Sequence, residues 1–292
     1  MSMTADEISS QPDIWARALT GTDAARELLA APGERALVIG CGTSAFVAES
    51  FAALRESAGL GETDAAYASE PRRWRAYDRV IAITRSGTTT EVLSALGAVP
   101  EGARTVAVTG VADSPVTGLT QDALVLDFAD ERSVVQTRFP TTFLLLARAA
   151  FGLGVDGVVE QARSTLAAPL PVDADAVDHF VFLGTGWTHG LAQEAALKIR
   201  EAAQAWSESY PLLDYRHGPL AVAGPSSLVW MLGADDARLA DEIRATGATV
   251  RVGTADPLVE LVQAQRLAVA VATARGLDPD APRHLTRSII LS

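Results

Sequence analysis

The chain has 292 residues, of which 48% are hydrophobic and 21% are charged, and its formal net charge is −12. This composition is typical of a globular protein, and the length predicts two domains or one large domain. The negative charge argues against non-specific binding of nucleic acid, so an anionic ligand would need a local group of donors.

The cysteine count, the first residues and the lengths of the apolar runs indicate the cellular compartment of the protein. The single cysteine, Cys41, excludes an internal disulfide and favours a reducing compartment. The first residues, MSMTADEISSQPDIW, lack the basic start and apolar centre of a signal peptide. No apolar run approaches the roughly 20 residues of a membrane-spanning helix. We therefore expect a soluble, cytoplasmic protein with no membrane partner.

Helical and strand-like patterns alternate along the first half of the chain. Residues 1–34 form an N-terminal segment that is predicted to be helical over about Ala5–Leu29. Strand-like runs follow at Ala36–Gly40, Ala65–Ser69, Arg79–Thr84, Thr105–Thr109 and Ala123–Leu126. Helical patterns lie among them at Ser44–Glu56, Thr89–Leu96 and Thr141–Phe151. Short apolar strands between helices predict a parallel sheet covered on both faces.

A second cycle of strands and helices follows an Ala/Pro-rich linker at 164–175. Its strands are predicted at His179–Leu183, Leu228–Leu232 and Ala248–Val252. Its helices are predicted at Leu191–Ala205, Ala237–Ala245 and Leu258–Arg275. The halves look like a tandem duplication of one α/β unit. We expect two αβα three-layer domains, at 35–160 and 161–292, each with a mainly parallel sheet of about five strands.

Two strand ends of the first half are rich in glycines and hydroxyls. The first reads GCGTSA, residues 40–45, and the second reads TRSGTTT, residues 84–90. Plain helix capping needs one hydroxyl, whereas the second strand end carries five. If the two strands are neighbours, the hydroxyls and N–H donors would form a cup for a phosphate, to which Arg85 adds a fixed charge. A third strand exit carries Gln136, Thr137 and Arg138.

Helix capping and dinucleotide binding remain alternative interpretations of the first strand end. The dinucleotide fingerprint is met in a relaxed form, with Ala45 at the third glycine position and Glu70 as a possible ribose ligand. A dinucleotide fold does not need the second hydroxyl-rich corner, so we rank it below the phosphate cup.

Three charged residues are predicted to share one stripe of a helix in the second half. Glu194, Lys198 and Glu201 are spaced by four and three, and Lys198 is the single lysine of the sequence. The alternative is a solvated stripe of ion pairs that contributes a few tenths of a kcal/mol. Because the helix starts at the ligand edge of the second sheet, we expect Lys198 to tune Glu201 or to hold a sugar hydroxyl.

Of the four histidines, His217 is the best candidate for an acid–base group. It lies in the loop DYRHGPLAV, which Gly218 and Pro219 stiffen. His179 begins a strand and is interpreted as structural, whereas His189 lies near the second glycine corner and His284 lies near the C-terminus. No P-loop and no metal-ligand spacing is visible, so we expect neither a metal nor another cofactor.

These motifs resemble the sugar isomerase (SIS) domain family. The chain is similar in pattern to the isomerase half of glucosamine-6-phosphate synthase and to related phosphosugar isomerases, deaminases and deglycases. The motifs are CGTSA (41–45), TRSGTTTEVL (84–93), VVQTRFPTT (134–142), the block 183–221 and the tail 278–292. The resemblance implies two tandem SIS domains and a phosphorylated sugar or amino sugar as substrate.

The resemblance also implies roles for individual residues. Glu201 would move a proton between C1 and C2 through an enediolate, with Lys198 and Glu194 as support. His217 would open the sugar ring, reaching the site from the neighbouring subunit of a homodimer. Residues implied in substrate binding are Cys41, Gly42, Thr43, Ser44, Thr84, Arg85, Ser86, Thr89, Val134, Glu194 and Arg287.

Three departures from the synthase pattern matter. No N-terminal cysteine nucleophile precedes residue 36, so we expect no glutamine amidotransferase activity. Arg287 stands where the synthase has a lysine that can form a Schiff base, which an arginine cannot do. Thr84-Arg85-Ser86 stands where the synthase reads Ser-Gln-Ser, and the extra cation favours a dianionic phosphate or an acidic sugar derivative.

The leading functional hypothesis is an aldose–ketose isomerase or an amino-sugar-phosphate deaminase that uses Glu201 as its base. The alternative is a sensor that binds a phosphosugar without chemistry, as related domains do in regulatory proteins. The absence of a helix-turn-helix before residue 36 and the intact pair of Glu201 and His217 favour the enzyme. A purely structural α/β protein would leave the hydroxyl-rich corners unexplained.

Overall fold

The computed structural model describes residues 2–70, 75–233 and 235–291. The chain divides into two compact units, and each unit includes one terminal segment. The first unit consists of Ser10–Asp156 and Thr286–Ser292, and the second unit consists of Met1–Ser9 and Gly157–Leu285. The expected boundaries at 34/35 and 160/161 stay a prediction about domains. The compact units have other boundaries, because residues 2–9 belong to the unit of the second sheet and residues 286–291 belong to the unit of the first sheet.

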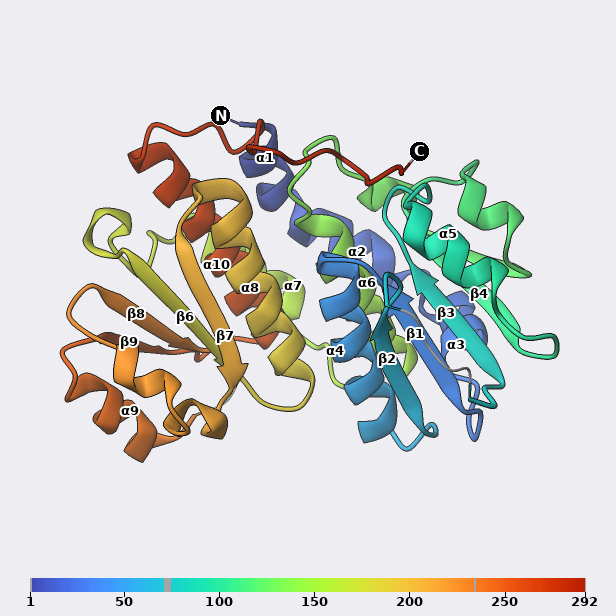
Figure 1. Ribbon diagram of the computed structural model, residues 1–292, viewed down its shortest axis with the longest axis horizontal. Helices are drawn as coiled ribbons and strands as arrows, with labels where there is room; N and C mark the ends of the chain where they lie inside the picture. The colour runs from blue at the N-terminus through green and yellow to red at the C-terminus, as the bar shows by residue number, and fades with distance from the viewer. Residues whose placement is uncertain (1, 71–74, 234, 292) are drawn as a thin grey trace. The chain divides into compact units, whose positions relative to one another are not determined.

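The first unit is built on a parallel sheet of five strands (Figure 1). The strands are β1 (Ala36–Gly40), β2 (Thr63–Tyr67), β3 (Arg79–Ile83), β4 (Arg104–Thr109) and β5 (Asp122–Val125). Their order is β2-β1-β3-β4-β5, and β1 and β3 are buried along their whole length. Burial on both faces explains why these strands read as continuous apolar runs.

Five helices and two 3-10 turns in the described part of the first unit surround its sheet. They are α2 (Gln11–Leu19), α3 (Thr22–Leu29), α4 (Thr43–Ser57), α5 (Thr90–Gly97) and α6 (Arg138–Ala150), with 3-10 turns η1 (Pro115–Gly118) and η2 (Asp127–Ala129). One face of the sheet packs against α5, through Val92 and Leu96 on Leu37, Ile39 and Val80. Helix α4 packs on β1 and β2 and contacts α6.

The second unit has a parallel sheet of four strands with the same kind of topology (Figure 1). The strands are β6 (His179–Gly184), β7 (Trp206–Pro211), β8 (Ser227–Met231) and β9 (Thr249–Val252), in the order β7-β6-β8-β9. In each sheet the first strand in sequence is flanked by the second on one side and the third on the other. The chain direction across the sheet therefore reverses next to β1 and next to β6.

Helices of the second unit include the longest ones of the described chain. They are α1 (Met3–Ser9), α7 (Val158–Ala167), α8 (Trp187–Ala203), α9 (Ala237–Arg244) and α10 (Pro257–Ala274), with 3-10 turns η3 (Ala174–Ala176), η4 (Leu213–Arg216) and η5 (Pro219–Val222). Asp236 caps α9 by accepting from Leu239 N at 2.8 Å, and Asp256 caps α10 by accepting from Leu258 N at 3.0 Å. Helix α8 packs on β6, β7 and α10.

The predicted α/β class with mainly parallel sheets is confirmed, with sheets of five and four strands. The prediction of a single N-terminal helix was wrong, because the chain forms separate helices that are interrupted at Ser10 and at Gly21. Helix α2 begins at Gln11, and Pro12 lies in its first turn, where proline is tolerated. The prediction missed β7 because its sequence, WSESYP, is polar and lies at the sheet edge. It also missed α7, which begins after Gly157 in the left-handed conformation.

Candidate functional site

The two hydroxyl-rich strand ends of the first unit are neighbours. Strand β1 pairs with β3 in parallel, with Ile39 opposite Ala82 near their carboxyl ends. This edge is also the switch point of the sheet, where open α/β sheets bind their ligands. The loop after β1 and the loop after β3 therefore lie side by side, which is the arrangement that a phosphate cup requires.

The first strand end makes a turn that needs glycine at two positions. A Cβ on Gly40 would lie 2.5 Å from the carbonyl carbon of Ser44, and Gly42 has φ 53° and ψ −126°. The corner after β6 repeats this geometry: a Cβ on Gly184 would lie 2.2 Å from the oxygen of Thr188, and Gly186 has φ 52° and ψ −128°. Both turns bring the backbone close to the start of the following helix.

The two corners differ in what the helix hydroxyl does. In the second unit, the Thr188 hydroxyl accepts from Thr185 N at 2.9 Å and donates to Thr185 O at 3.0 Å, which closes the corner. In the first unit, Ser44 is buried, but its hydroxyl makes no hydrogen bond to the residues that the structure describes. The second corner is thus closed by the Thr188 hydroxyl, whereas the Ser44 hydroxyl takes no part in closing the first corner.

Hydroxyls of the second strand end partly hold their own loop. Thr84 Oγ1 accepts from Gly87 N at 3.3 Å, and Ser86 Oγ accepts from Thr88 Oγ1 at 3.0 Å. Thr89 is the residue before α5, and its side chain makes no capping hydrogen bond. The loop is therefore preorganised by its own side chains and ends in a hydroxyl at a helix N-terminus, where anions are favoured.

Arg85 has a structural role in this loop. Its side chain is buried, and its two terminal nitrogens donate to Ser133 O at 2.7 Å and Arg287 O at 2.8 Å. These contacts join the loop after β3 to the loop before α6 and to the C-terminal tail. The prediction that Arg85 binds phosphate stays a prediction, and any such contact would compete with these carbonyl groups.

The buried carboxylate of Glu131 holds the loop before α6, where the sequence predicted a third hydroxyl-bearing strand end. Glu131 Oε1 accepts from Thr137 N at 2.5 Å, Thr137 Oγ1 at 2.7 Å and Arg138 N at 2.7 Å, which caps α6. Arg138 also donates to Ser10 Oγ at 3.1 Å. Thr137 and Arg138 therefore support the fold of this loop. Val134, expected to contact substrate, is half-buried in it.

The C-terminal tail crosses the same loops of the first unit. Arg287 makes a salt bridge to Asp130 at 2.6 Å and donates to Glu131 O. Thr90 N donates to Ile289 O at 3.1 Å. The Arg287 guanidinium is thus held by an acidic partner, and its correspondence with the Schiff-base lysine of the synthase stays a prediction.

Cys41 follows β1 directly, at the carboxyl ends of the strands of the first sheet, and is half-buried. Burial, and then the nearby Glu91 carboxylate, raises the pKa of the Cys41 thiol. A thiol whose pKa is raised is poorly suited to act as a nucleophile near neutral pH.

The charged stripe of α8 in the second unit is a connected ion-pair group. Lys198 Nζ lies 2.5 Å from Glu201 Oε2 and 3.4 Å from Glu194 Oε1. The side chains of Glu194 and Lys198 are each 1% exposed, whereas that of Glu201 is 19% exposed. The predicted common stripe is confirmed, and it is not a solvated one: two members are buried and Glu201 reaches the surface.

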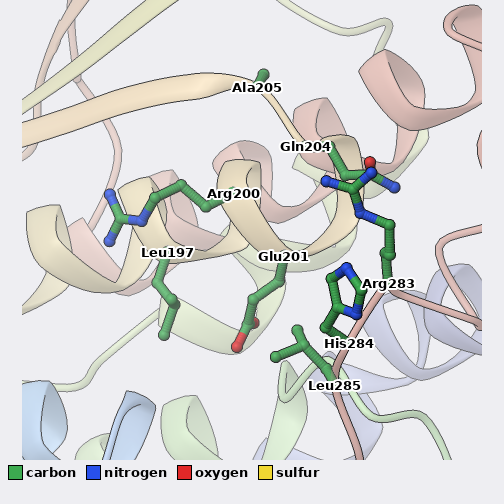
Figure 2. A pocket seen from close by; sticks show the side chains of 8 residues that line it. All are labelled: Leu197, Arg200, Glu201, Gln204, Ala205, Arg283, His284 and Leu285. Carbon is green, nitrogen blue, oxygen red and sulfur yellow. The ribbon is translucent and has the colours of Figure 1, made fainter.

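Glu201 lines a pocket of about 430 Å³ in the second unit (Figure 2). The lining residues are Leu197, Arg200, Glu201, Gln204, Ala205, Arg283, His284 and Leu285. This volume lies within the usual range of small-molecule pockets. The sequence interpretation missed Arg283 and His284 here, because nothing in their pattern indicates that the chain folds back along α8.

His217 lies elsewhere in the second unit, in the exposed loop between η4 and η5. It is not among the residues that line the Glu201 pocket. Arg216 anchors the loop through salt bridges to Asp236 at 3.2 Å and Glu242 at 2.6 Å. Burial raises the pKa of Tyr215 to about 12, so this phenol serves as a protonated core residue.

In 2–70, 75–233 and 235–291, no group of three or more His, Cys, Asp or Glu side chains could hold a metal ion. No helix in these ranges is both long and apolar enough to span a bilayer.

Comparison with known proteins identifies the fold. No family model matches the chain. A solved glucosamine-6-phosphate deaminase from Thermotoga maritima is 28% identical, with 99% of this chain and 100% of that chain covered and a TM-score of 0.88. The C-terminal domain of a glucosamine-fructose-6-phosphate aminotransferase from Francisella tularensis superposes over 97% of this chain and 98% of that one, with a TM-score of 0.79 and 21% identity.

The chain has an SIS-type phosphosugar isomerase fold. Among curated relatives, the glutamine–fructose-6-phosphate aminotransferase of Methanothermobacter thermautotrophicus is 30% identical over 97% of this chain and 56% of its own length. The chain thus spans about half the length of the curated relatives it matches. Its homologues are phosphosugar isomerases and deaminases, and it corresponds to the isomerase part of the aminotransferases.

Proposed function

We propose that this protein is an aldose–ketose isomerase or an amino-sugar-phosphate deaminase acting on a phosphorylated hexose. Glu201 is the base that moves a proton between C1 and C2 through an enediolate. The observation that carries the proposal is the position of Glu201, whose carboxylate lines a pocket while a buried lysine holds it at 2.5 Å. The short contact with the lysine fixes the orientation of the carboxylate, which a general base needs in order to reach the proton it removes.

Substrate binding is assigned to the hydroxyl-rich strand ends of the first unit. Their adjacency at a switch point, the hydroxyl of Ser44 and the N-terminus of α5 support a phosphate there. The repeated strand order and the matching glycine corners support two tandem SIS domains. We further propose a homodimer in which His217 opens the sugar ring at the partner's site.

Glu201→Gln tests the base directly. This change keeps the shape of the side chain and its hydrogen bond but removes its basicity. We expect turnover of glucosamine 6-phosphate or fructose 6-phosphate to fall by roughly 10²- to 10⁴-fold, with little change in affinity. Steady-state rates and a thermal-shift titration would measure the two quantities.

A phosphosugar sensor is the competing outcome. If wild-type protein is stabilised by a hexose 6-phosphate but turns over none of them, the protein is a sensor. A ligand at 100 times its dissociation constant should raise the free energy of unfolding by about 2.7 kcal/mol, which is readily detected.

A further inference from the structure

His284 lines the Glu201 pocket and has a left-handed backbone conformation, which is uncommon for residues other than glycine. It lies on a turn closed by Leu285 N donating to Pro282 O at 3.4 Å, and its φ is 64°. Apart from glycine, the residues that adopt this conformation more often than the rest are asparagine, aspartate and histidine. Figure 2 shows its imidazole on the pocket wall with Glu201, from a segment separate from α8.

The proposed reaction needs a second group that exchanges protons. When Glu201 has taken the proton from C2, its carboxyl holds that proton until it is returned to C1. Over the whole conversion of an aldose with a C2 hydroxyl to its ketose, the carbonyl oxygen O1 must also gain a proton and the hydroxyl O2 must lose one. A carboxyl that carries the carbon-bound proton cannot also move the oxygen-bound proton.

His284 is the lining residue suited to this second task. Arg200 and Arg283 stay protonated in proteins, and Arg200 also donates to Ser207 O at 2.9 Å. Lys198 is buried between two carboxylates. The other lining residues are apolar or carry an amide. An imidazole can both give and accept a proton near neutral pH.

We propose that His284 is the oxygen-side acid–base residue of the site and acts with Glu201 of the same chain. With an aldose that has a C2 hydroxyl, its imidazolium donates a proton to O1 and its neutral form then takes the proton from O2, so the group ends the cycle as it began. With a 2-amino sugar, only the donation to O1 applies. This inference rests on the proposed function. It differs from the role of His217, which concerns ring opening.

His284→Asn tests the inference because asparagine tolerates left-handed backbone and cannot relay the proton. Two rates are measured in deuterated buffer for each probe: exchange of the carbon-bound hydrogen, at C2 of glucosamine 6-phosphate or at C1 of fructose 6-phosphate, and conversion to product. We expect conversion to fall by about 100-fold and exchange to fall much less, so their ratio rises. Added imidazole should restore part of the conversion.

Arg275→Gln is the control, because Arg275 is an exposed residue of the same unit and does not line the Glu201 pocket. Its ratio of exchange to conversion should equal that of wild type. The inference is overturned if His284→Asn converts substrate at the wild-type rate. It is also overturned if both rates fall together and imidazole restores neither, since His284 would then only shape the turn. If wild type neither exchanges nor converts either probe, the proposed function itself fails, and this inference fails with it.

Discussion

Single residues decide what each glycine corner can bind. Gly40 and Gly184 are required because any Cβ would meet the backbone of the next helix. The following turns are nearly superimposable in φ and ψ, yet Thr188 closes its corner with two hydrogen bonds and Ser44 does not. The sequence predicted hydroxyls at a strand end. Their hydrogen-bond partners depend on side-chain rotamers, which a sequence pattern does not specify.

Arginine roles were the least predictable from sequence. Arg85 and Arg287 both belong to motifs of the expected site, but their guanidinium groups are engaged by Ser133, Asp130 and Glu131. A guanidinium has five donors and a long side chain, so its partners are set by the loops around it. His284 was missed for a related reason, since a turn in the tail brings it to the pocket.

Lys198 should contribute strongly to stability as well as to the site. Replacing it with methionine leaves the buried carboxylate of Glu194 without its cation at 3.4 Å. We expect the free energy of unfolding to fall by about 3–5 kcal/mol. The double variant Lys198→Met, Glu194→Gln should recover much of this loss in urea denaturation, because no buried charge remains. Equal losses for the single and double variants would mean that the charge is not the cause.

At the level of elements, the strands that are buried on both faces were predicted from the sequence, whereas a strand at the sheet edge was not. Strand β1 was predicted residue for residue because an apolar run buried on both faces leaves a clear pattern. Strand β7 has one neighbouring strand, so it can keep polar residues and gives no such pattern. Helix ends were predicted less well than helix centres, since caps such as Glu131 act from outside the helix.

Glu131 should stabilise α6 and the loop before it. Its carboxylate is buried and accepts hydrogen bonds at the helix N-terminus from Thr137 N, Thr137 Oγ1, Arg138 N and Phe139 N. We expect Glu131→Ala to lower the free energy of unfolding by about 1–2 kcal/mol, the usual range for a lost N-cap. Hydrogen exchange should report faster opening of the first turn of α6. Replacement of exposed Glu160 in α7 is the control and should have little effect. Unchanged exchange in α6 would contradict this role.

For the whole molecule, the central expectation is that active sites are shared between chains. His217 lies in an exposed loop and does not line the Glu201 pocket of its own chain. We expect His217→Ala and Glu201→Gln to be inactive alone. Co-expressed chains should regain about a quarter of wild-type activity if one site of each mixed dimer is intact. Full activity of a monomer in light scattering would contradict shared sites.

Transfer of a carbon-bound proton by Glu201 is the claim on which the account depends. The most direct measurement is deuterium incorporation at C1 or C2 of a hexose 6-phosphate in deuterated buffer, followed by mass spectrometry. The account predicts incorporation with wild type and a loss of roughly 10²- to 10⁴-fold with Glu201→Gln. Equal incorporation by the two proteins would contradict it, because the base would then be another residue.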